Sequence, residues 1–252
     1  MRTTSTFTHH RSSQASTSTY RQDAHDERAV QRAIHVSQLV LIGLAFSIGG
    51  LTEATAKGWE KVGTYDDVKV SRKSVEGSPL LAFRGVTEVD LPLDIIIGTF
   101  TDPKQRRHWV DRYKEHVTIK KTELSETYWI HFKLPPLVSN RDYVLKSDAT
   151  IDKDKGTIEV KIKSVTHDKY PPDCCVRAEV KGTYYKFTAL SATRTKLEVE
   201  VHTDPKGLLP NWLVNLIQKK WPSKTLSGLI RHARKVNASH PKTKEWLSKK
   251  FP

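Results

Sequence analysis

The chain has 252 residues, of which 42 are Lys or Arg and 28 are Asp or Glu, so its formal net charge is +14. This length allows one or two domains, and the excess of positive charge favours an anionic partner such as a membrane surface or a nucleic acid. The chain has only two cysteines, Cys174 and Cys175, which excludes a disulfide-rich scaffold. Adjacent cysteines bridge only through a strained ring, and metal binding needs more clustered ligands than these. A redox role for the pair is left as a minor alternative.

The N-terminal part is interpreted as an export signal. Residues 1–35 are rich in Ser, Thr, His and Arg without apolar periodicity, which is typical of disorder. The apolar run at 39–51 is too short for a membrane span of about 20 residues. Basic residues precede this run and the small residues Ala54 and Ala56 follow it, so 36–56 is predicted to be a signal peptide cleaved after Ala56. An uncleaved anchor, or a translation start further downstream, is the alternative.

Removal of this segment leaves one domain at 57–238 and a basic tail at 239–252, in a protein that we expect to be periplasmic or secreted. Positive charge is concentrated near the C-terminus, where ten Lys or Arg residues and the single acid Glu245 lie between Gln218 and Lys250. No nucleic-acid-binding module is recognisable, and export also argues against a nucleic-acid partner. The charge therefore indicates either a solvated surface or a patch that contacts an anionic membrane.

Most of the chain between residues 65 and 201 has an apolar period of two, which predicts strands with one buried face. Four segments, ETYWIHFKL, DYVLKSDAT, TIEVKIKSV and TKLEVEVHT, alternate apolar side chains with polar or charged ones. Lys and Glu on the charged faces can pair across neighbouring strands. Gly182 predicts a bulge where a strand bends. The pattern indicates an antiparallel sheet with one wet side.

Two short helical segments are expected before residue 120. The segment LPLDIIIGTF has apolar residues at helical spacing. The next helix is expected to begin with Asp102 as N-cap and Pro103 as its first residue. Trp109, Val110 and Tyr113 would then share one face of this helix.

A long amphipathic helix is predicted from Asn211 to Lys235. Its apolar stripe consists of Trp212, Leu213, Leu216, Ile217, Leu226, Leu229, Ile230 and Ala233. Pro222 in its middle predicts a kink, because proline removes a hydrogen bond and crowds a carbonyl one turn back. The predicted fold class is α+β, with a curved antiparallel sheet wrapped around this helix. Such an arrangement can leave an apolar cavity.

Several segments together resemble a known family. They are SPLLAFRGVTEVDLPLD, VSNRDYVL, PPDCCVRAEVKGTYYKFTAL, HTDPKGLLPNWLVN and WPSKTL. In this order they resemble the START domain, the steroidogenic-acute-regulatory-protein-related lipid transfer family, from about Gly58 to Lys235, in a bacterial and exported member. The resemblance implies a helix-grip fold and an apolar tunnel that holds one lipid, such as a sterol or phospholipid. It also implies no chemistry, cofactor or metal, and we expect a monomer.

Sterol-carrying members of this family are similar in having an acid and an arginine that face each other inside the tunnel. The position that aligns with the arginine is Ser147, and the segment TYWIHFKL contains no acid. The resemblance therefore leaves the lipid unidentified.

The candidate lining of the tunnel consists of apolar and aromatic residues of the strands and helices. They are Trp109, Tyr113, Tyr128, Ile130, Phe132, Tyr143, Leu145, Ile158, Val160, Val199, Leu213, Leu216 and Ile217. The alternative for each is a role in the packed core. The predicted membrane contact consists of Lys219, Lys220, Trp221, Lys224 and Arg231. The long helix would act as a lid that moves at Pro222, with a static kinked helix as the alternative.

An enzyme is the main competing function, namely a hydrolase or cyclase that acts on a hydrophobic substrate in the same fold. The sequence lacks a G-x-S-x-G elbow, an H-E-x-x-H motif and a glycine-rich phosphate loop. His131, His167 and His202 lie on predicted outer faces or in a loop, where we expect them to be exposed to solvent rather than catalytic.

Overall fold

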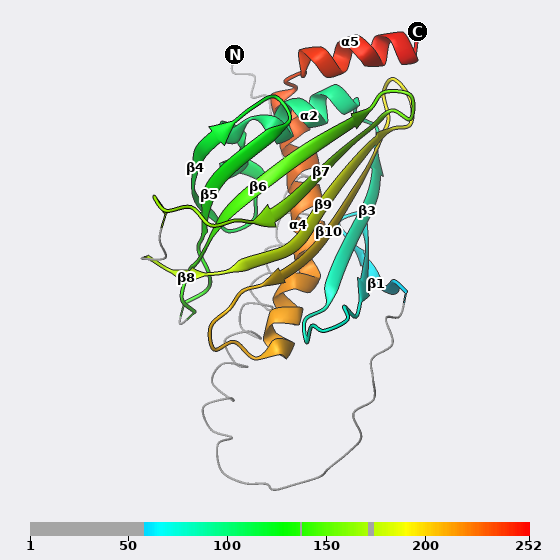
Figure 1. Cartoon of the computed structure of the whole chain (residues 1–252). Helices are drawn as coiled ribbons and strands as arrows, with labels where there is room; N and C mark the ends of the chain where they lie inside the picture. Colours follow the sequence, from blue (N-terminus) through cyan, green and yellow to red (C-terminus); the bar gives the residue numbers. More distant parts are fainter. Residues whose placement is uncertain (1–57, 137, 171–173) are drawn as a thin grey trace, which may run out of the picture. The chain divides into compact units, whose positions relative to one another are not determined.

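The computed structural model describes residues 58–136, 138–170 and 174–252 (Figure 1). The strands are β1 (Glu60–Tyr65), β2 (Val68–Lys73), β3 (Ala82–Val89), β4 (Tyr113–Lys121), β5 (Ser125–Phe132), β6 (Arg141–Asp152), β7 (Thr157–Ser164), β8 (Val176–Arg177), β9 (Glu179–Ala189) and β10 (Thr195–Asp204). The helices are α2 (Leu93–Thr101), the short 3-10 helix η1 (Pro103–Gln105), α3 (Arg106–Trp109), α4 (Asn211–Val236) and α5 (Pro241–Lys250).

All ten described strands belong to one sheet. Its order is β1-β2-β3-β10-β9-β7-β6-β5-β4, and β8 pairs with β6 outside this path. Neighbours along the path are antiparallel, whereas β8 runs parallel to β6. Figure 1 shows α4 running along one side of this sheet. The α+β helix-grip fold predicted from the sequence is therefore confirmed.

The strand register determines which side chains share a face. On the face that packs against α4, here called the inner face, Val199 pairs with Tyr185, and Tyr185 pairs with Val160. On the outer face Glu159 pairs with Lys186, and their side chains form a 3.1 Å ion pair of the expected kind. The predicted bulge is confirmed, because the register between β9 and β10 shifts beside Gly182.

Helix α4 lies very close to its neighbours at two glycines. A Cβ atom at Gly85 of β3 would lie 2.8 Å from Cβ of Pro222, and one at Gly228 would lie 2.6 Å from the carbonyl oxygen of Trp109. Both distances are shorter than carbon and oxygen atoms tolerate, so only glycine permits this packing. Helix α4 continues through the buried Pro222 from Asn211 to Val236.

The buried apolar side chains form two clusters. The larger one, here called the helix-packed cluster, joins Leu226, Leu229 and Ala233 of α4 to the inner faces of β2, β3, β7, β9 and β10 and to α2. The smaller one, here called the strand cluster, consists of Tyr128, Ile130, Leu145 and Val180, with Tyr113, Phe132, Tyr143 and Ile162 packed against it. Every described member of the strand cluster comes from a strand.

The helix expected after Asp102 is shorter than the sequence predicts. Asp102 caps η1 as expected, because its side chain accepts a hydrogen bond of 2.9 Å from the backbone N–H of Lys104. Helix α3 then ends at Trp109, and Tyr113 is the first residue of β4 instead of a helical residue. Arg112 has a φ of 57°, in the left-handed region, and this turn separates helix from strand.

The C-terminal segment interpreted as a basic tail contains helix α5. Its Trp246 and Leu247 are buried in the helix-packed cluster, and His240 caps its first turn by accepting a hydrogen bond from the N–H of Thr243. The basic side chains Lys242, Lys244 and Lys249 remain exposed. The segment is therefore amphipathic and packed.

The expected signal peptide and the cleavage site after Ala56 lie outside the described residues. Among the residues that the structure describes, no helix combines the length and the apolar character needed to cross a membrane.

Replacement of Gly228 by Ala tests the close packing of α4. Alanine favours a helix by up to about 1 kcal/mol over glycine, but its Cβ would collide with the Trp109 carbonyl. We expect the variant to lose about 1–3 kcal/mol of unfolding free energy, measured by urea denaturation. The control is Gly182→Ala, because a Cβ atom at this position of β9 would meet nothing within 4 Å. A Gly228→Ala variant more stable than the native chain would contradict this packing.

Candidate functional site

The strand cluster is a part of the inner face whose buried residues are separate from the helix-packed cluster. Tyr128 and Ile130 of β5 pair with Leu145 and Tyr143 of β6, so their side chains lie on one face. Tyr128 is 6% exposed and Ile130 is 4% exposed, although no described member of the strand cluster belongs to α4. A buried, mostly apolar surface with a few polar groups beside it is the usual lining of a ligand site.

The structure divides the predicted lining residues into separate groups. Tyr113, Tyr128, Ile130, Phe132, Tyr143 and Leu145 belong to the strand cluster. Trp109, Ile158, Val160 and Val199 belong to the helix-packed cluster, where they pack with α2 and α4. In the first turns of α4, Leu213 is buried, Ile217 is half-buried, and Leu216 is exposed instead of facing the interior.

A buried group of charged and polar side chains lies at one side of the strand cluster. Glu126 follows the same inner face of β5 as Tyr128, two residues away. Arg106 of α3 donates a 2.5 Å hydrogen bond to Glu126 Oε2, and the hydroxyl of Thr118 in β4 donates one of 2.7 Å to Glu126 Oε1. His116 Nε2 contacts Arg106 and lies 3.5 Å from Glu126.

The protonation states of this group follow from its contacts. Burial alone would raise the pKa of Glu126, but the contact with His116 and the charge of Arg106 lower that pKa to about 2. Burial is also the main cause that lowers the pKa of His116 below its usual value of 6.5. At neutral pH Glu126 is therefore ionised and His116 is neutral. A carboxylate fixed in this way holds Arg106 in place and is a poor proton donor.

Sequence reasoning missed this acid. Glu126 immediately precedes the segment in which an acid was sought, and it pairs across the sheet with Ser147, the position aligned with the family's arginine. The hydroxyl of Ser147 donates a 3.3 Å hydrogen bond to the carbonyl of Glu126. A buried acid, Glu126, is therefore present on β5, and the arginine that pairs with it, Arg106, belongs to α3. The only available signal was the alternation of β5, which places Glu126 on the Tyr128 face.

Five buried side-chain polar atoms have no hydrogen-bond partner among the described residues. Two of them are Nε1 of Trp109, at the end of α3, and the hydroxyl of Thr225, in the middle of α4. Trp109 is 7% exposed and Thr225 is 1% exposed. A buried polar atom without a partner costs about 1–3 kcal/mol, so a polar group of a bound ligand could offset that cost.

Arg141 holds two loops together where β5 ends and β6 begins. Its guanidinium donates hydrogen bonds to the carbonyl of Ser139, in the β5–β6 loop, and to the carbonyls of Pro205 and Lys206, each of the latter at 2.9 Å. Arg141 is 3% exposed and pairs with Phe132 in the register. The loop at 205–210 leads directly into α4, so Arg141 fixes the start of this helix beside the strand cluster.

Two side-chain hydrogen bonds hold the first half of α4 on the sheet. Oδ1 of Asn215 accepts a 3.1 Å bond from the N–H of Leu81, before β3, and Nε2 of Gln218 donates a 2.7 Å bond to the carbonyl of Thr203 in β10. Both lie before Pro222. This half of the helix is therefore attached by these polar contacts together with the buried Leu213 and Val214. The second half carries Leu226, Leu229 and Ala233 of the core.

Large apolar side chains are exposed at and just before the N-terminal end of α4. Leu208 in the preceding loop is fully exposed, Trp212 is 51% exposed and Leu216 is 40% exposed. The membrane-contact residues predicted from the sequence are less exposed. Lys219, Lys220, Trp221 and Lys224 are half-buried, and Arg231 is exposed. Trp221 packs against the helix-packed cluster, so Trp212 is the exposed tryptophan of α4.

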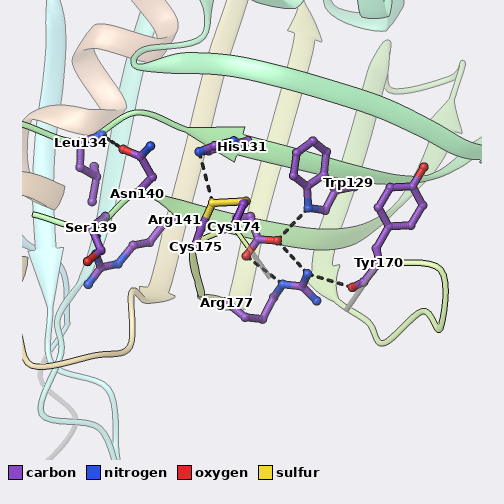
Figure 2. The surroundings of a disulfide bond; sticks show 11 residues. Trp129, His131, Leu134, Ser139, Asn140, Arg141, Tyr170, Cys174, Cys175 and Arg177 are labelled. Carbon is purple, nitrogen blue, oxygen red and sulfur yellow. Dashed lines mark hydrogen bonds and ion pairs between the residues drawn. A yellow bond between two sulfur atoms is a disulfide. The ribbon is translucent and has the colours of Figure 1, made fainter. Parts of the chain in front are cut away.

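The outer face of β5 and β6 carries a second group of side chains (Figure 2). Cys174 and Cys175 form a disulfide with each other, although the sequence argued against a bridge. His131 is 3% exposed and contacts Cys175, so the expectation that it faces solvent is wrong. Cys175, which directly precedes β8, lies against the His131 ring. His202 is half-buried and is hydrogen-bonded to Ser78, and His167 is also half-buried.

Comparison with known proteins agrees with this architecture. The family model described as the START domain matches residues 51–238. An uncharacterised protein of Pseudomonas aeruginosa is 28% identical over 200 residues, which cover 78% of this chain and 96% of that protein. A solved STAR-related lipid transfer protein from Xanthomonas axonopodis is 26% identical with a TM-score of 0.62, over 71% of this chain and 99% of that one. Human STARD10 is 23% identical with a TM-score of 0.64, over 80% of this chain and 85% of that one, and shares the fold.

Replacement of Glu126 by Gln tests the buried charged group. The change leaves the Arg106 charge without its partner, so we expect a loss of about 3 kcal/mol in unfolding free energy at pH 7. Because the pKa of Glu126 is lowered from 4.5 to about 2, its contribution is present above pH 4.5 and is lost as the pH falls toward 2. The stability difference between native chain and variant should therefore shrink across this interval.

Glu76→Gln, at an exposed carboxylate, is the control for this experiment. Urea denaturation at a series of pH values measures all three proteins. A difference between the native chain and Glu126→Gln that stays constant from pH 7 to pH 2 would contradict the assignment.

Proposed function

The chain belongs to the START domain family, and we propose that it binds one lipid along the strand cluster, beneath α4, and carries it between membranes without changing it chemically. The observation that carries this proposal is a buried apolar strand face that lies beside a buried charged group. An acyl chain of about 16 carbons exposed to water costs on the order of 10 kcal/mol. The aromatic and aliphatic side chains of the strand cluster can cover such a chain.

The charged and polar atoms of the interior favour an amphiphilic ligand over a pure hydrocarbon. The Arg106 guanidinium, centred 4.6 Å from the Tyr128 ring, connects the charged group to the apolar wall. The unpartnered Nε1 of Trp109 and the Thr225 hydroxyl offer further hydrogen bonds. A lipid with its tails on the strand cluster and its polar group toward these atoms would match both parts of the site.

The start of α4 is the proposed passage for the lipid. The first half of the helix would move away when the hydrogen bonds of Asn215 and Gln218 break and its buried apolar residues leave their contacts, while the second half stays in the core. Pro222 lies between the halves and lacks the N–H that would strengthen the helix there. Leu208, Trp212 and Leu216 would enter the membrane, where a tryptophan suits the interface. Lys219, Lys224 and Arg231 would add about 1 kcal/mol each near anionic lipid.

This proposal includes transport outside the cytoplasm, on the basis of the export signal inferred for residues 36–56. It is tested directly by native mass spectrometry and lipid extraction of the purified full chain. We expect one lipid for each chain, recovered intact after incubation. Release of a chemically altered lipid would instead support an enzyme.

Replacement of Ile130 by Trp tests the position of the lipid. The larger ring would fill the space beside the strand cluster, so we expect lipid occupancy to fall several-fold with a small loss of stability. The matched variant Val160→Trp changes the helix-packed cluster, where overpacking costs about 1–3 kcal/mol. Lipid occupancy by mass spectrometry and stability by urea denaturation separate the two. If Ile130→Trp took up lipid normally and lost as much stability as Val160→Trp, the lipid would not bind at the strand cluster.

Replacement of Leu208 and Trp212 by Ser tests the membrane contact. Loss of both apolar side chains removes several kcal/mol of burial in the bilayer, so lipid transfer between vesicles should slow by on the order of tenfold. A fluorescent lipid exchanged between donor and acceptor vesicles gives the rate. Leu190→Ser is the control, because Leu190 is 42% exposed in the β9–β10 turn. Equal rates for the double variant and this control would exclude the contact.

A further inference from the structure

The group on the outer face is separate from the proposed lipid site. His131 of β5 faces Asp142 of β6 in the register, whereas their neighbours Ile130 and Tyr143 lie on the inner face. Cys174 and Cys175 precede β8, which runs parallel to β6 on this outer side. Figure 2 shows the disulfide beside His131, with Trp129 and Arg177 nearby. Both Trp129 and Arg177 donate hydrogen bonds to Asp142. A ligand on this face would not compete with a lipid on the other.

The sulfur atoms and the imidazole lie within reach of one ion. Sγ of Cys175 is 3.3 Å from Nε2 of His131, and the ligand atoms of His131, Cys174 and Cys175 all lie within 4.8 Å of one another. Neighbouring residues of an extended strand point to opposite faces. The bend at Cys174 and Cys175 instead turns both side chains toward the same place. Reduction would therefore leave two thiols directed at His131.

Contacts other than the disulfide hold these residues together. Asp142 is fully buried and accepts hydrogen bonds of 2.7 Å from Trp129 and of 3.0 and 2.7 Å from Arg177. Arg177 also donates a 2.9 Å bond to the carbonyl of Tyr170. The N–H of Val176 bonds to the carbonyl of Asn140 at 3.1 Å. Reduction breaks none of these bonds, so the cysteines stay beside β5 and β6.

We propose that reduction of the Cys174–Cys175 disulfide creates a metal site in which both cysteine sulfurs and Nε2 of His131 bind one Zn²⁺ ion. An external dithiol supplies the two electrons and two protons, so the protein disulfide becomes two thiols while the dithiol becomes a disulfide. Zn²⁺ then displaces the two thiol protons. Two thiolates and one divalent ion carry no net charge, which suits a partly buried position.

The donor set selects the kind of metal. Two thiolates and one imidazole favour Zn²⁺ or a softer ion over Mg²⁺ or Ca²⁺, which prefer oxygen ligands. Zinc binds sulfur at about 2.3 Å and nitrogen at about 2.0–2.1 Å in a tetrahedron, which places these two ligand atoms roughly 3.6 Å apart. The observed 3.3 Å between His131 and Cys175 needs little change. Cys174 is exposed, so water can take the fourth position.

The oxidised and metal-bound states exclude each other, because a disulfide has no thiolate to offer. The chain can therefore report or respond to its redox environment by gaining or losing one ion.

Metal titration of the full chain tests the site. The protein is reduced with a phosphine, which does not chelate, and titrated with Co²⁺ as a coloured substitute for Zn²⁺ and then with Zn²⁺. We expect one ion for each reduced chain, with the absorption of thiolate-bound tetrahedral cobalt, and no such absorption from the oxidised chain. Mg²⁺ should neither bind nor displace the cobalt.

Single variants assign the ligands. Cys174→Ser and Cys175→Ser should abolish the thiolate–cobalt absorption of the native site, and His131→Gln should weaken Zn²⁺ binding by on the order of tenfold or more, since even outer-shell changes cost that much. His108→Gln, at an exposed histidine of α3, is the matched control. Circular dichroism checks that each variant folds. If His131→Gln does not fold, Cys174→Ser still tests the site.

A lipid measurement tests whether the metal site is independent of the proposed lipid site. Lipid occupancy, measured on the same samples by native mass spectrometry, should be equal with and without metal. Reduced native chain that binds no more metal than Cys174→Ser would overturn the proposal, as would equal binding by the oxidised chain. Folded His131→Gln that binds Zn²⁺ as tightly as the native chain would overturn the three-ligand assignment.

Discussion

The close approach of α4 to β3 and α3 determines how the interior of this protein is used. Gly85 and Gly228 let the helix lie directly on its neighbours, and the second half of α4 therefore fills the helix-packed cluster. The residues of α4 in that cluster pack with β2, β3, β7, β9 and β10, and none of them is a described member of the cluster on β5 and β6. The strand cluster is left with buried apolar side chains that come from strands alone. One part of the inner face thus packs against the second half of α4, and the other is the part on which we propose that the lipid binds.

The charged group beside the strand cluster differs from the apolar clusters, because its burial costs free energy. Burying Arg106 and Glu126 removes both from water, and their mutual attraction offsets this penalty only because Thr118 and His116 complete the contacts. Such a pair contributes little net stability, but it fixes a polar point inside an apolar region. Orientation of an amphiphilic ligand needs a point of this kind. The ionised state of Glu126 also fits a binding role better than proton transfer.

The strands, their faces and the long helix could be predicted because each depends on local periodicity. The alternation in β5 placed Tyr128, Ile130 and Phe132 together, and α4 was predicted to within a residue of its observed end. Tyr113 was assigned to a helix because its spacing from Trp109 is helical, and the sequence pattern does not reveal the left-handed turn at Arg112.

Contacts between distant segments could not be predicted in this way. The Arg106–Glu126 pair depends on where α3 lies over β5, and neither residue carries a local signal for it. The same holds for His131, whose outer-face position was predicted, while its burial depends on a segment more than 40 residues later. The exposed Trp212 and the packed Trp221 likewise occupy one helix with similar local sequence, and only tertiary packing distinguishes them.

Arg141 binds its two loops entirely through backbone carbonyls. Every amino acid offers the same carbonyl, so the identities of the residues at 139, 205 and 206 have no direct part in these bonds. Substitutions, including changes of charge or size, can accumulate there while the loops stay attached. The end of the molecule where α4 begins can therefore change in sequence while one arginine preserves its geometry.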